Sequence, residues 1–316
     1  MPLLVSSAFL HCKKKKTMSH TLTLVASAAA SPLEGALLER AAALCENHEI
    51  HKIREPVWLA EGKAADIGLS DTLDNSAVEA LRDLLAPDKV DFFINPAEHR
   101  RKSLLLADMD STIVTGETLD ELAGYAGLKD HISAITARAM NGELDFEAAL
   151  RERVKLLKGL PVSKLDETLE ETKLSVGAEI FVKTMAHNGA KCVLVSGGFT
   201  FFTEAIAGKA GFHAHHGNTL GLEEGTLNGE VIDPILDKSA KLNFLNHYTL
   251  ASGINPHQTL TIGDGANDLP MLKAAGLGIG YRPKETVKKE IANCILYGDL
   301  TAALYAQGYR ESEFII

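Results

Sequence analysis

The stretch Leu104-Leu105-Leu106-Ala107-Asp108-Met109-Asp110-Ser111-Thr112 decides how the rest of this chain is interpreted. Its four apolar residues predict a buried strand, and two carboxylates, Asp108 and Asp110, follow at the end of that strand. In a parallel sheet the carboxyl ends of the strands are where ligands and catalytic groups gather. A solvated loop after a strand explains the pair equally well, so the choice depends on what the other strand ends carry.

The composition is that of a globular protein with an acidic charge balance. The chain has 316 residues, of which 46% are hydrophobic and 23% charged, and its formal net charge is −10. This charge argues against nucleic acid or an anionic membrane as the main partner, although a metal ion or local Lys and Arg side chains can still admit a small anionic substrate. No apolar run of about 18 residues is present and the four cysteines form no Cys-x-x-Cys pair, so we expect a cytoplasmic protein.

The pattern of apolar residues divides the chain into segments of different character. Its length suits two domains, or one domain with an insertion. An apolar start followed by four lysines has the wrong order for a secretory signal, and a helical segment without strand signal interrupts an otherwise alternating α/β pattern. We therefore predict a disordered extension (1–17), an N-terminal α+β module (18–98), a doubly wound parallel α/β core (99–115 and 178–316) and a helical cap (116–177).

Smaller elements follow from the same pattern. In the N-terminal module we expect strands over 21–26, 56–59 and 90–94 and helices over 33–48 and 75–85, without any chemical motif. In the core we expect a hairpin over residues 218–232, with Asn228-Gly229 as its turn. His213, His215 and His216 have no acidic partner in the sequence, so we interpret them as structural or surface residues.

Two further strand ends in the predicted core carry polar groups. Ser196-Gly197-Gly198 follows the apolar run 192–195, and Gly263-Asp264-Gly265-Ala266-Asn267-Asp268 follows 259–262. Each alone could be a tight turn, but three such ends in one parallel sheet are unlikely to be accidental. Oxygen ligands such as Asp108 and Asp264 suit Mg²⁺, and glycines before a helix let backbone N–H groups approach an anion. A carboxylate beside metal and phosphate can attack phosphorus, and a second acid can move the protons.

On these residues the chain resembles the haloacid dehalogenase-like phosphatases, and within them the branch that acts on phosphoserine. The resemblance covers residues 104–304 and includes expected cap residues as well as the strand ends. The matching stretches are Asp108 to Thr112, Glu117 to Glu121, Phe146, Leu150 to Val154, Val195 to Phe199, Lys238 to Lys241 and Gly263 to Asp268. The resemblance implies Mg²⁺-dependent hydrolysis of O-phospho-L-serine to L-serine and phosphate, the last step of L-serine biosynthesis.

The resemblance also implies a role for each matching residue at the phosphate. Asp108 is expected to be the nucleophile that forms an aspartyl-phosphate, and Asp110 the general acid and base. The Asp108 carboxylate, the Asp110 backbone carbonyl and Asp264 are expected to hold Mg²⁺, with Asp268 supporting its water shell and orienting Lys241. The remaining contacts to phosphate or substrate are expected from Ser196, Gly197, Lys241 and Asn267.

Two further residues are expected to select the substrate. The resemblance implies that Glu117 meets the substrate ammonium and Arg153 its carboxylate, which the planar guanidinium can hold through two parallel hydrogen bonds. Without the resemblance, Glu117 reads as a helix-start residue and Arg153 as a solvated helix residue. Met140 and Phe146 are expected to pack around the short carbon skeleton, unless they belong to an ordinary core.

Two alternatives remain open from the sequence. In one, the aspartyl-phosphate passes its phosphoryl group to an acceptor such as homoserine. In the other, the chain is mainly an amino-acid sensor through its N-terminal module, whose pattern resembles the ACT-like regulatory domains attached to some bacterial members of the family. No residue motif supports that likeness, and a homodimer is possible.

Overall fold

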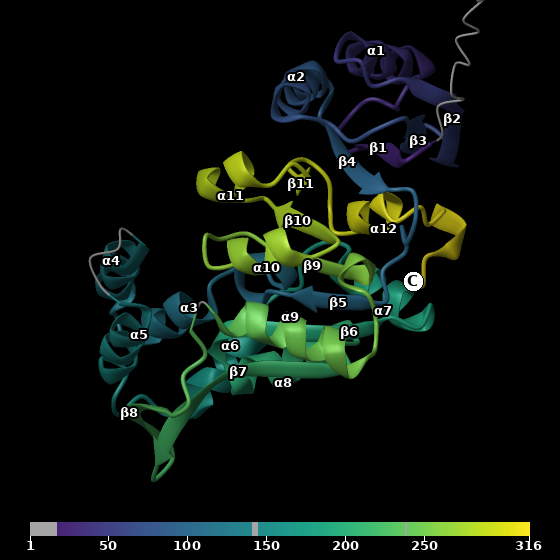
Figure 1. Cartoon of the computed structure of the whole chain (residues 1–316). Coiled ribbons are helices and arrows are strands. Elements are labelled where there is room, and N and C mark those ends of the chain that lie inside the picture. Colours follow the sequence, from purple (N-terminus) through teal and green to yellow (C-terminus); the bar gives the residue numbers. More distant parts are fainter. Residues whose placement is uncertain (1–17, 141–144, 238) are drawn as a thin grey trace, which may run out of the picture.

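The computed structural model describes residues 18–140, 145–237 and 239–316, so the extension predicted over residues 1–17 lies outside the described part. The elements form a four-stranded N-terminal sheet and a seven-stranded central sheet (Figure 1). Within the described ranges, no helix combines the length and apolarity needed to cross a membrane.

The N-terminal module is an antiparallel sheet with two helices on one face. Its strand order is β2-β3-β1-β4, so the hairpin partner β3 lies between the two strands that α1 connects. This is the split β-α-β arrangement. Its elements are β1 (His20–Ala26), α1 (Gly35–Asn47), β2 (Lys52–Ala60), β3 (Ala64–Leu69), α2 (Asn75–Leu85) and β4 (Val90–Pro96).

Strand β3 was missed by the sequence prediction, although all six of its residues are buried. Its short run Ala-Ala-Asp-Ile-Gly-Leu contains Asp66 and Gly68, which are both depleted in strands. The buried Asp66 carboxylate is paired with Arg100, whose two terminal nitrogens lie 2.5 and 2.6 Å from its oxygens. A partner that lies 34 residues away cannot be read from a local pattern.

The central sheet has the order β11-β10-β9-β5-β6-β7-β8 and is parallel except for β8, which pairs antiparallel with β7. This confirms the predicted parallel α/β core. The strands are β5 (Leu104–Ala107), β6 (Lys191–Phe199), β7 (Ala214–Glu223), β8 (Thr226–Ile232), β9 (Thr259–Gly263), β10 (Leu277–Tyr281) and β11 (Cys294–Ile295).

Helices cover both faces of this sheet, which explains why every residue of β5 and β9 is buried. Leu105 and Ala107 of β5 belong to the core beneath α7 and α8, whereas Leu104 and Leu106 belong to the core beneath α9 and α10. Successive side chains alternate between the two cores, as the pleat requires. The helices are α7 (Ala178–His187), α8 (Thr200–Ala210), α9 (Ala240–Ala251), α10 (Leu269–Ala274), α11 (Glu285–Glu290) and α12 (Ala302–Ala306).

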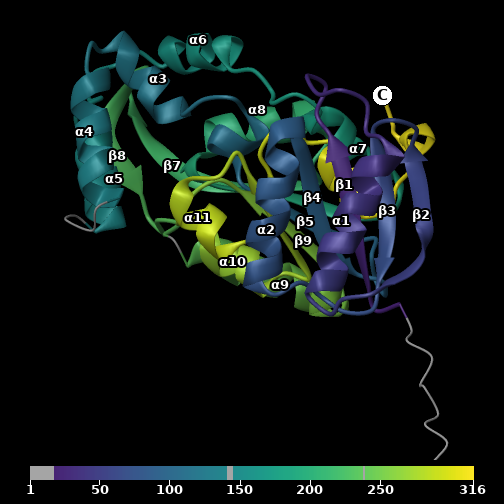
Figure 2. The same cartoon turned by 90° about the horizontal axis from the view of Figure 1, so that it is seen from above.

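In the described part of the segment between β5 and α7 there are four α-helices, where the sequence pattern predicts helices without strands. They stand beside the sheet (Figure 2), and the β7–β8 hairpin is hydrogen-bonded to them through Gly159 and Leu160, which bond to Leu227, and through Val162, which bonds to Gly225. These helices are α3 (Thr118–Tyr125), α4 (Lys129–Met140), α5 (Phe146–Lys155) and α6 (Ser163–Glu171).

The predicted hairpin turn is wrong. The register pairs Glu223 with Thr226, so the two-residue turn is Glu224-Gly225, and Asn228-Gly229 lies inside β8. Both turn residues have positive φ (45° and 78°), as a tight two-residue hairpin turn requires. Gly225 supplies the turn instead, because glycine adopts a positive φ without a steric penalty.

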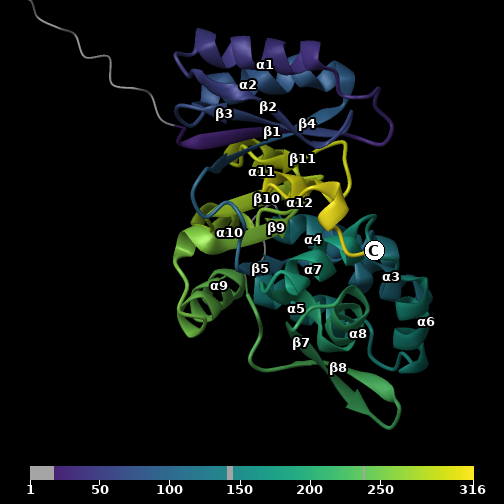
Figure 3. The ribbon, with the colours of Figure 1, turned by 90° about the vertical axis from the view of Figure 1, so that its right-hand side faces the viewer.

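The N-terminal module is docked on the segment that contains α11 and β11 (Figure 3). Arg82 of α2 donates to three backbone carbonyls of that segment, at 2.9 Å (Lys288), 2.7 Å (Ile291) and 3.1 Å (Ala292). The Asp91 carboxylate of β4 accepts hydrogen bonds from three successive backbone N–H groups, at Leu296, Tyr297 and Gly298. These contacts are polar and directional, and they lie beside an apolar part of the interface, where Val25, Ala64 and Phe93 of the module share a buried core with α12.

Arg82→Ala is expected to lower the free energy of unfolding by about 1–3 kcal/mol, because three carbonyls at the interface lose their charged donor. Urea unfolding followed by circular dichroism measures the change. Arg40→Ala, which removes an exposed arginine from α1, is the control and should leave stability within about 0.5 kcal/mol. Equal stability of the Arg82 and Arg40 variants would contradict a role for Arg82 in docking.

Candidate active site

Of the two carboxylates that follow β5, Asp108 is buried and Asp110 is half-buried, and different parts of the chain hold them. Asp108 lies directly after the strand, and its Oδ1 is 2.6 Å from Lys241 Nζ. Asp110 lies in the following turn, where its Oδ1 accepts from the backbone N–H (2.9 Å) and hydroxyl (2.8 Å) of Thr118. Its Oδ2 accepts from the Ser196 hydroxyl at 3.1 Å. The pair is therefore not a solvated loop.

Lys241 is the buried cation that joins two strand ends. It lies in the first turn of α9, and its Nζ is 2.6 Å from Asp108 and 2.5 Å from Asp268. Burial alone would lower the pKa of Lys241. The two carboxylates raise the pKa by a larger amount, so it lies above its ordinary value and the side chain stays charged. Burial and the nearby Asp268 raise the pKa of Asp108 well above its ordinary range, against the opposing effect of Lys241.

The loop after β9 brings Asp264 and Asp268 to the same place. Asp268 is fully buried, and its Oδ2 accepts from the backbone N–H groups of Asp264 (3.1 Å) and Gly265 (3.0 Å). A Cβ atom on Gly263 would lie 2.4 Å from Asp268 Cγ, which explains why glycine begins this stretch. Burial is the main cause that raises the pKa of Asp264.

Oxygen atoms of Asp108, Asp264 and Asp268 all lie within 4.8 Å of one another, which suits a metal ion. Both oxygens of Asp268 are already engaged, one with Lys241 and one with backbone N–H groups. The available oxygens therefore belong to Asp108 and Asp264. A donor set of carboxylate oxygens fits a hard divalent cation.

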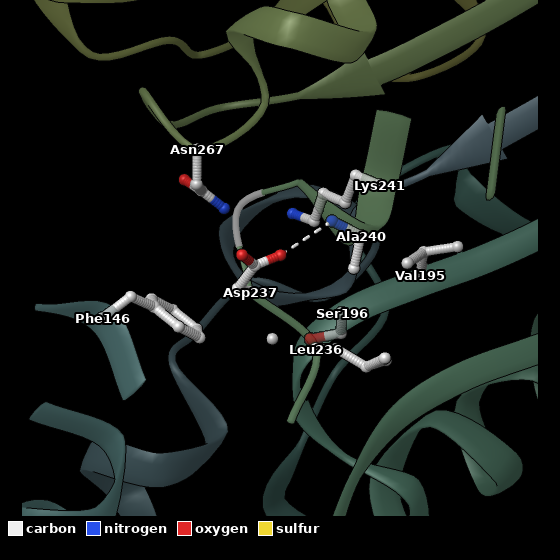
Figure 4. A pocket seen from close by; sticks show the side chains of 9 residues that line it. Phe146, Val195, Ser196, Leu236, Asp237, Ala240, Lys241 and Asn267 are labelled. Atoms are coloured by element: carbon white, nitrogen blue, oxygen red, sulfur yellow. Dashed lines mark hydrogen bonds between the residues drawn. The ribbon is translucent and has the colours of Figure 1, made fainter. Parts of the chain in front are cut away.

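A small pocket opens beside these acids. Figure 4 shows that Ser196, Lys241 and Asn267 point toward it from three different elements, with Phe146 of α5 on the opposite side. Gly197 lines the same pocket, and a Cβ atom there would lie 3.2 Å from the Phe146 ring. Ser196 is buried and lines the base of this pocket, between polar and aromatic side chains.

Glu117 and Arg153 approach this region from the inserted helices. Glu117 precedes α3, and its Oε1 accepts from the Ser111 hydroxyl at 2.7 Å. Partial desolvation and the neighbouring Asp110 raise the pKa of Glu117. Arg153 of α5 donates to Thr136 Oγ1 at 3.2 Å, and burial lowers its pKa against the attraction of Asp120, Glu117 and Asp110. A carboxylate and a guanidinium thus face the acids of β5 together.

The structure brings together the residues expected at the phosphate and the metal, which are Asp108, Asp110, Ser196, Gly197, Lys241, Asp264, Asn267 and Asp268. Glu117 and Arg153 are not among the residues that line the pocket, and their link to the acids is through charge. The side chain of Met140 lies outside the described residues. Sequence reasoning missed Thr118, which bonds Asp110, and Lys284, whose Nζ lies 3.3 Å from Asp264 Oδ2. Lys284 follows β10, so the rule about strand ends, applied to one more strand, would have found it.

Comparison with known proteins agrees with this geometry. The family model for haloacid dehalogenase-like hydrolase matches residues 105–273, which is more than half of the chain. The chain belongs to this family. Its members typically use a metal ion, which fits the cluster of acids described above.

Three named proteins are similar to this chain. A phosphoserine phosphatase of Archaeoglobus fulgidus is 43% identical over 190 residues, covering 60% of this chain and 55% of the relative. A solved phospho-aspartyl intermediate analogue of phosphoserine phosphatase is 38% identical, with a TM-score of 0.61, covering 65% of this chain and 98% of that one. The probable phosphoserine phosphatase of Vibrio cholerae has a TM-score of 0.74 and 28% identity, covering 95% and 89%. The matches span about half the length of the first curated relatives (52–55%).

Lys241→Met is expected to lower the free energy of unfolding by about 3 kcal/mol at about pH 8, because Asp108 and Asp268 would remain buried without their cation. The loss should shrink toward about pH 5. Lys241 lowers the pKa of Asp108 against the effects of burial and Asp268, so its removal raises that pKa further. The folded variant then binds a proton at a pH where the unfolded chain does not, and it regains stability as the pH falls.

Urea unfolding of the metal-free protein at both pH values measures this effect. Lys289→Met, which removes an exposed lysine from α11, is the control and should change little at either pH. An equal loss for Lys241→Met at the two pH values would contradict the assignment of Lys241 as the counter-charge of Asp108.

Proposed function

We propose that this protein hydrolyses O-phospho-L-serine to L-serine and phosphate with the help of Mg²⁺. The observation that carries the proposal is the combination of two groups of side chains at one place. A buried Asp108–Lys241–Asp268 cluster suits a phosphate, and the Glu117–Arg153 pair suits the ammonium and carboxylate of an amino acid. The names of the relatives support the same substrate.

At the phosphate, Asp108 is proposed to attack phosphorus and to form an aspartyl-phosphate, while Asp110 protonates the leaving serine oxygen. Asp110 suits this task because burial raises its pKa, which favours the protonated form. In the second step Asp110 would take a proton from the water that hydrolyses the acyl phosphate. Ser196, the Gly197 N–H and Lys241 would hold the phosphoryl oxygens, with Asn267 at the pocket edge.

Mg²⁺ is proposed to be held by the carboxylates of Asp108 and Asp264 and by the backbone carbonyl of Asp110. When bound, the ion would neutralise charge on the phosphate and on the attacking carboxylate. Asp268 would not be a ligand, because Lys241 and two backbone N–H groups already occupy its oxygens. Its task would be to fix Lys241 and the loop that carries Asp264.

At the other end of the substrate, Arg153 would bind the carboxylate and Glu117 the ammonium. Both side chains come from the inserted region, so we propose that residues 116–177 act as a cap that encloses the amino acid and excludes water. The catalytic core would then comprise residues 99–115 and 178–316. Phe146 lies on the cap side of the pocket, where it can contact the short carbon chain (Figure 4).

The N-terminal module is proposed to be an ACT-like regulatory or scaffolding domain over residues 18–98. Its antiparallel sheet with helices on one face supports this, and so does the probable phosphoserine phosphatase of Vibrio cholerae, which aligns over 95% of this chain. The arrangement of strands by itself does not specify a ligand.

Asp108→Asn is expected to lower kcat for phosphoserine by about a thousandfold or more, because an amide is a far weaker nucleophile than a carboxylate. Phosphate release in the presence of Mg²⁺ measures the rate, and circular dichroism checks the fold. Asp83→Asn on the exposed face of α2 is the control and should keep full activity. Retained turnover in the Asp108 variant would show that another group attacks the phosphorus.

Arg153→Ala is expected to lower kcat/KM for phosphoserine about 100-fold more than kcat/KM for p-nitrophenyl phosphate, which has no carboxylate. The matched control is Arg151→Ala on the same helix, whose side chain bonds Glu147 and Asp233 instead. That variant should affect the two substrates alike. Equal losses on both substrates for Arg153→Ala would remove its proposed role in binding the carboxylate.

A further inference from the structure

Lys284 approaches the acidic cluster from a strand end that the proposed chemistry does not use. It lies between β10 and α11, and its backbone N–H donates to the Asp264 carbonyl at 2.9 Å. Its Nζ lies 3.3 Å from Asp264 Oδ2. The backbone hydrogen bond fixes where the side chain begins, so the ammonium is held close to Asp264 without being buried.

The acids of the cluster have counter-charges that differ in how easily they can be displaced. Asp108 and Asp268 share Lys241, which is almost completely buried. Among the described residues, the cation within 4 Å of the Asp264 carboxylate is Lys284, whose side chain is 45% exposed against 9% for Asp264. An exposed ammonium returns to water at little cost, so this pair is the exchangeable one.

We propose that Lys284 competes with the metal ion for Asp264 and thereby lowers the affinity of the site for Mg²⁺. The inference rests on the proposed function only in assigning Asp264 to the metal. A positive charge this close to the carboxylate must move away, or repel the ion, when a divalent cation binds the same group. Lys284 is thus a positioning residue that compensates Asp264 in the metal-free protein.

The surroundings of Lys284 allow its ammonium to move away from Asp264. Its side chain is 45% exposed, and the carboxylates of Glu117 and Asp108 attract its ammonium in addition to that of Asp264. Lys284 in turn lowers the pKa of Glu117, which shows that the two groups interact. When the metal ion takes Asp264, Lys284 keeps the attraction of Glu117 and its contact with water.

Calorimetric titration of Mg²⁺ into the metal-free protein, without substrate, tests the proposal. Lys284→Met should lower the Kd for Mg²⁺ about three- to tenfold, because the competing charge is gone. Lys284→Arg, which keeps the charge, should stay within about twofold of the unchanged protein. Lys289→Met in α11, the helix that follows Lys284, is the control for loss of an exposed lysine and should not change the Kd.

The outcomes separate this inference from the proposed function. An unchanged or higher Kd for Lys284→Met overturns the competition, and a higher Kd would mean that Lys284 orients Asp264 instead. Asp264→Asn should abolish Mg²⁺ binding; if it binds as the unchanged protein does, the proposed metal site itself is wrong. Melting temperatures check folding, and Lys284→Gln provides the same test should the methionine variant not fold.

Discussion

Lys241 lies between Asp108 and Asp268 with both carboxylates within 2.6 Å of its ammonium, and all three groups are buried. Removing charges from water is unfavourable unless they are paired closely, so this contact constrains the positions of β5, α9 and the loop after β9 at once. Asp268 adds two backbone hydrogen bonds that hold the same loop. The geometry of the site thus depends on one buried cation more than on any single strand.

The remaining charges are arranged around this fixed centre in order of increasing exposure. Lys241 is enclosed by the sheet and its helices, whereas Arg153 is half-buried on an inserted helix and Lys284 is open to water. A buried cation can serve every state of the site, but a half-buried or exposed one can exchange partners. This gradation suits a site that is proposed to receive a metal ion and a zwitterionic substrate in addition to its own acids.

The strand ends of the parallel core were predictable from the sequence, because runs of apolar residues and the polar residues that follow them can both be recognised locally. Four apolar residues before Asp108, and glycines around Ser196 and Asp264, are readable without any knowledge of distant contacts. Glu117 and Arg153 were found only through the family resemblance, since a charged residue on a helix has no distinctive pattern. Strand β3 was missed because its buried Asp66 is satisfied by Arg100, which lies far away in the sequence. The hairpin turn was misplaced because two nearby stretches each contain a glycine, and the turn forms at Glu224-Gly225 and not at Asn228-Gly229.

The docking of the N-terminal module places a structural constraint near the site. Arg82 holds carbonyls at the C-terminal end of α11, and Lys284 stands at the N-terminal end of that helix with its backbone bonded to Asp264. A helix of six residues joins these two contacts. This short segment is therefore tied to the N-terminal module at one end and to the Asp264 backbone at the other. The Lys241 pair does not depend on this segment, because β5, α9 and the loop after β9 supply its three side chains.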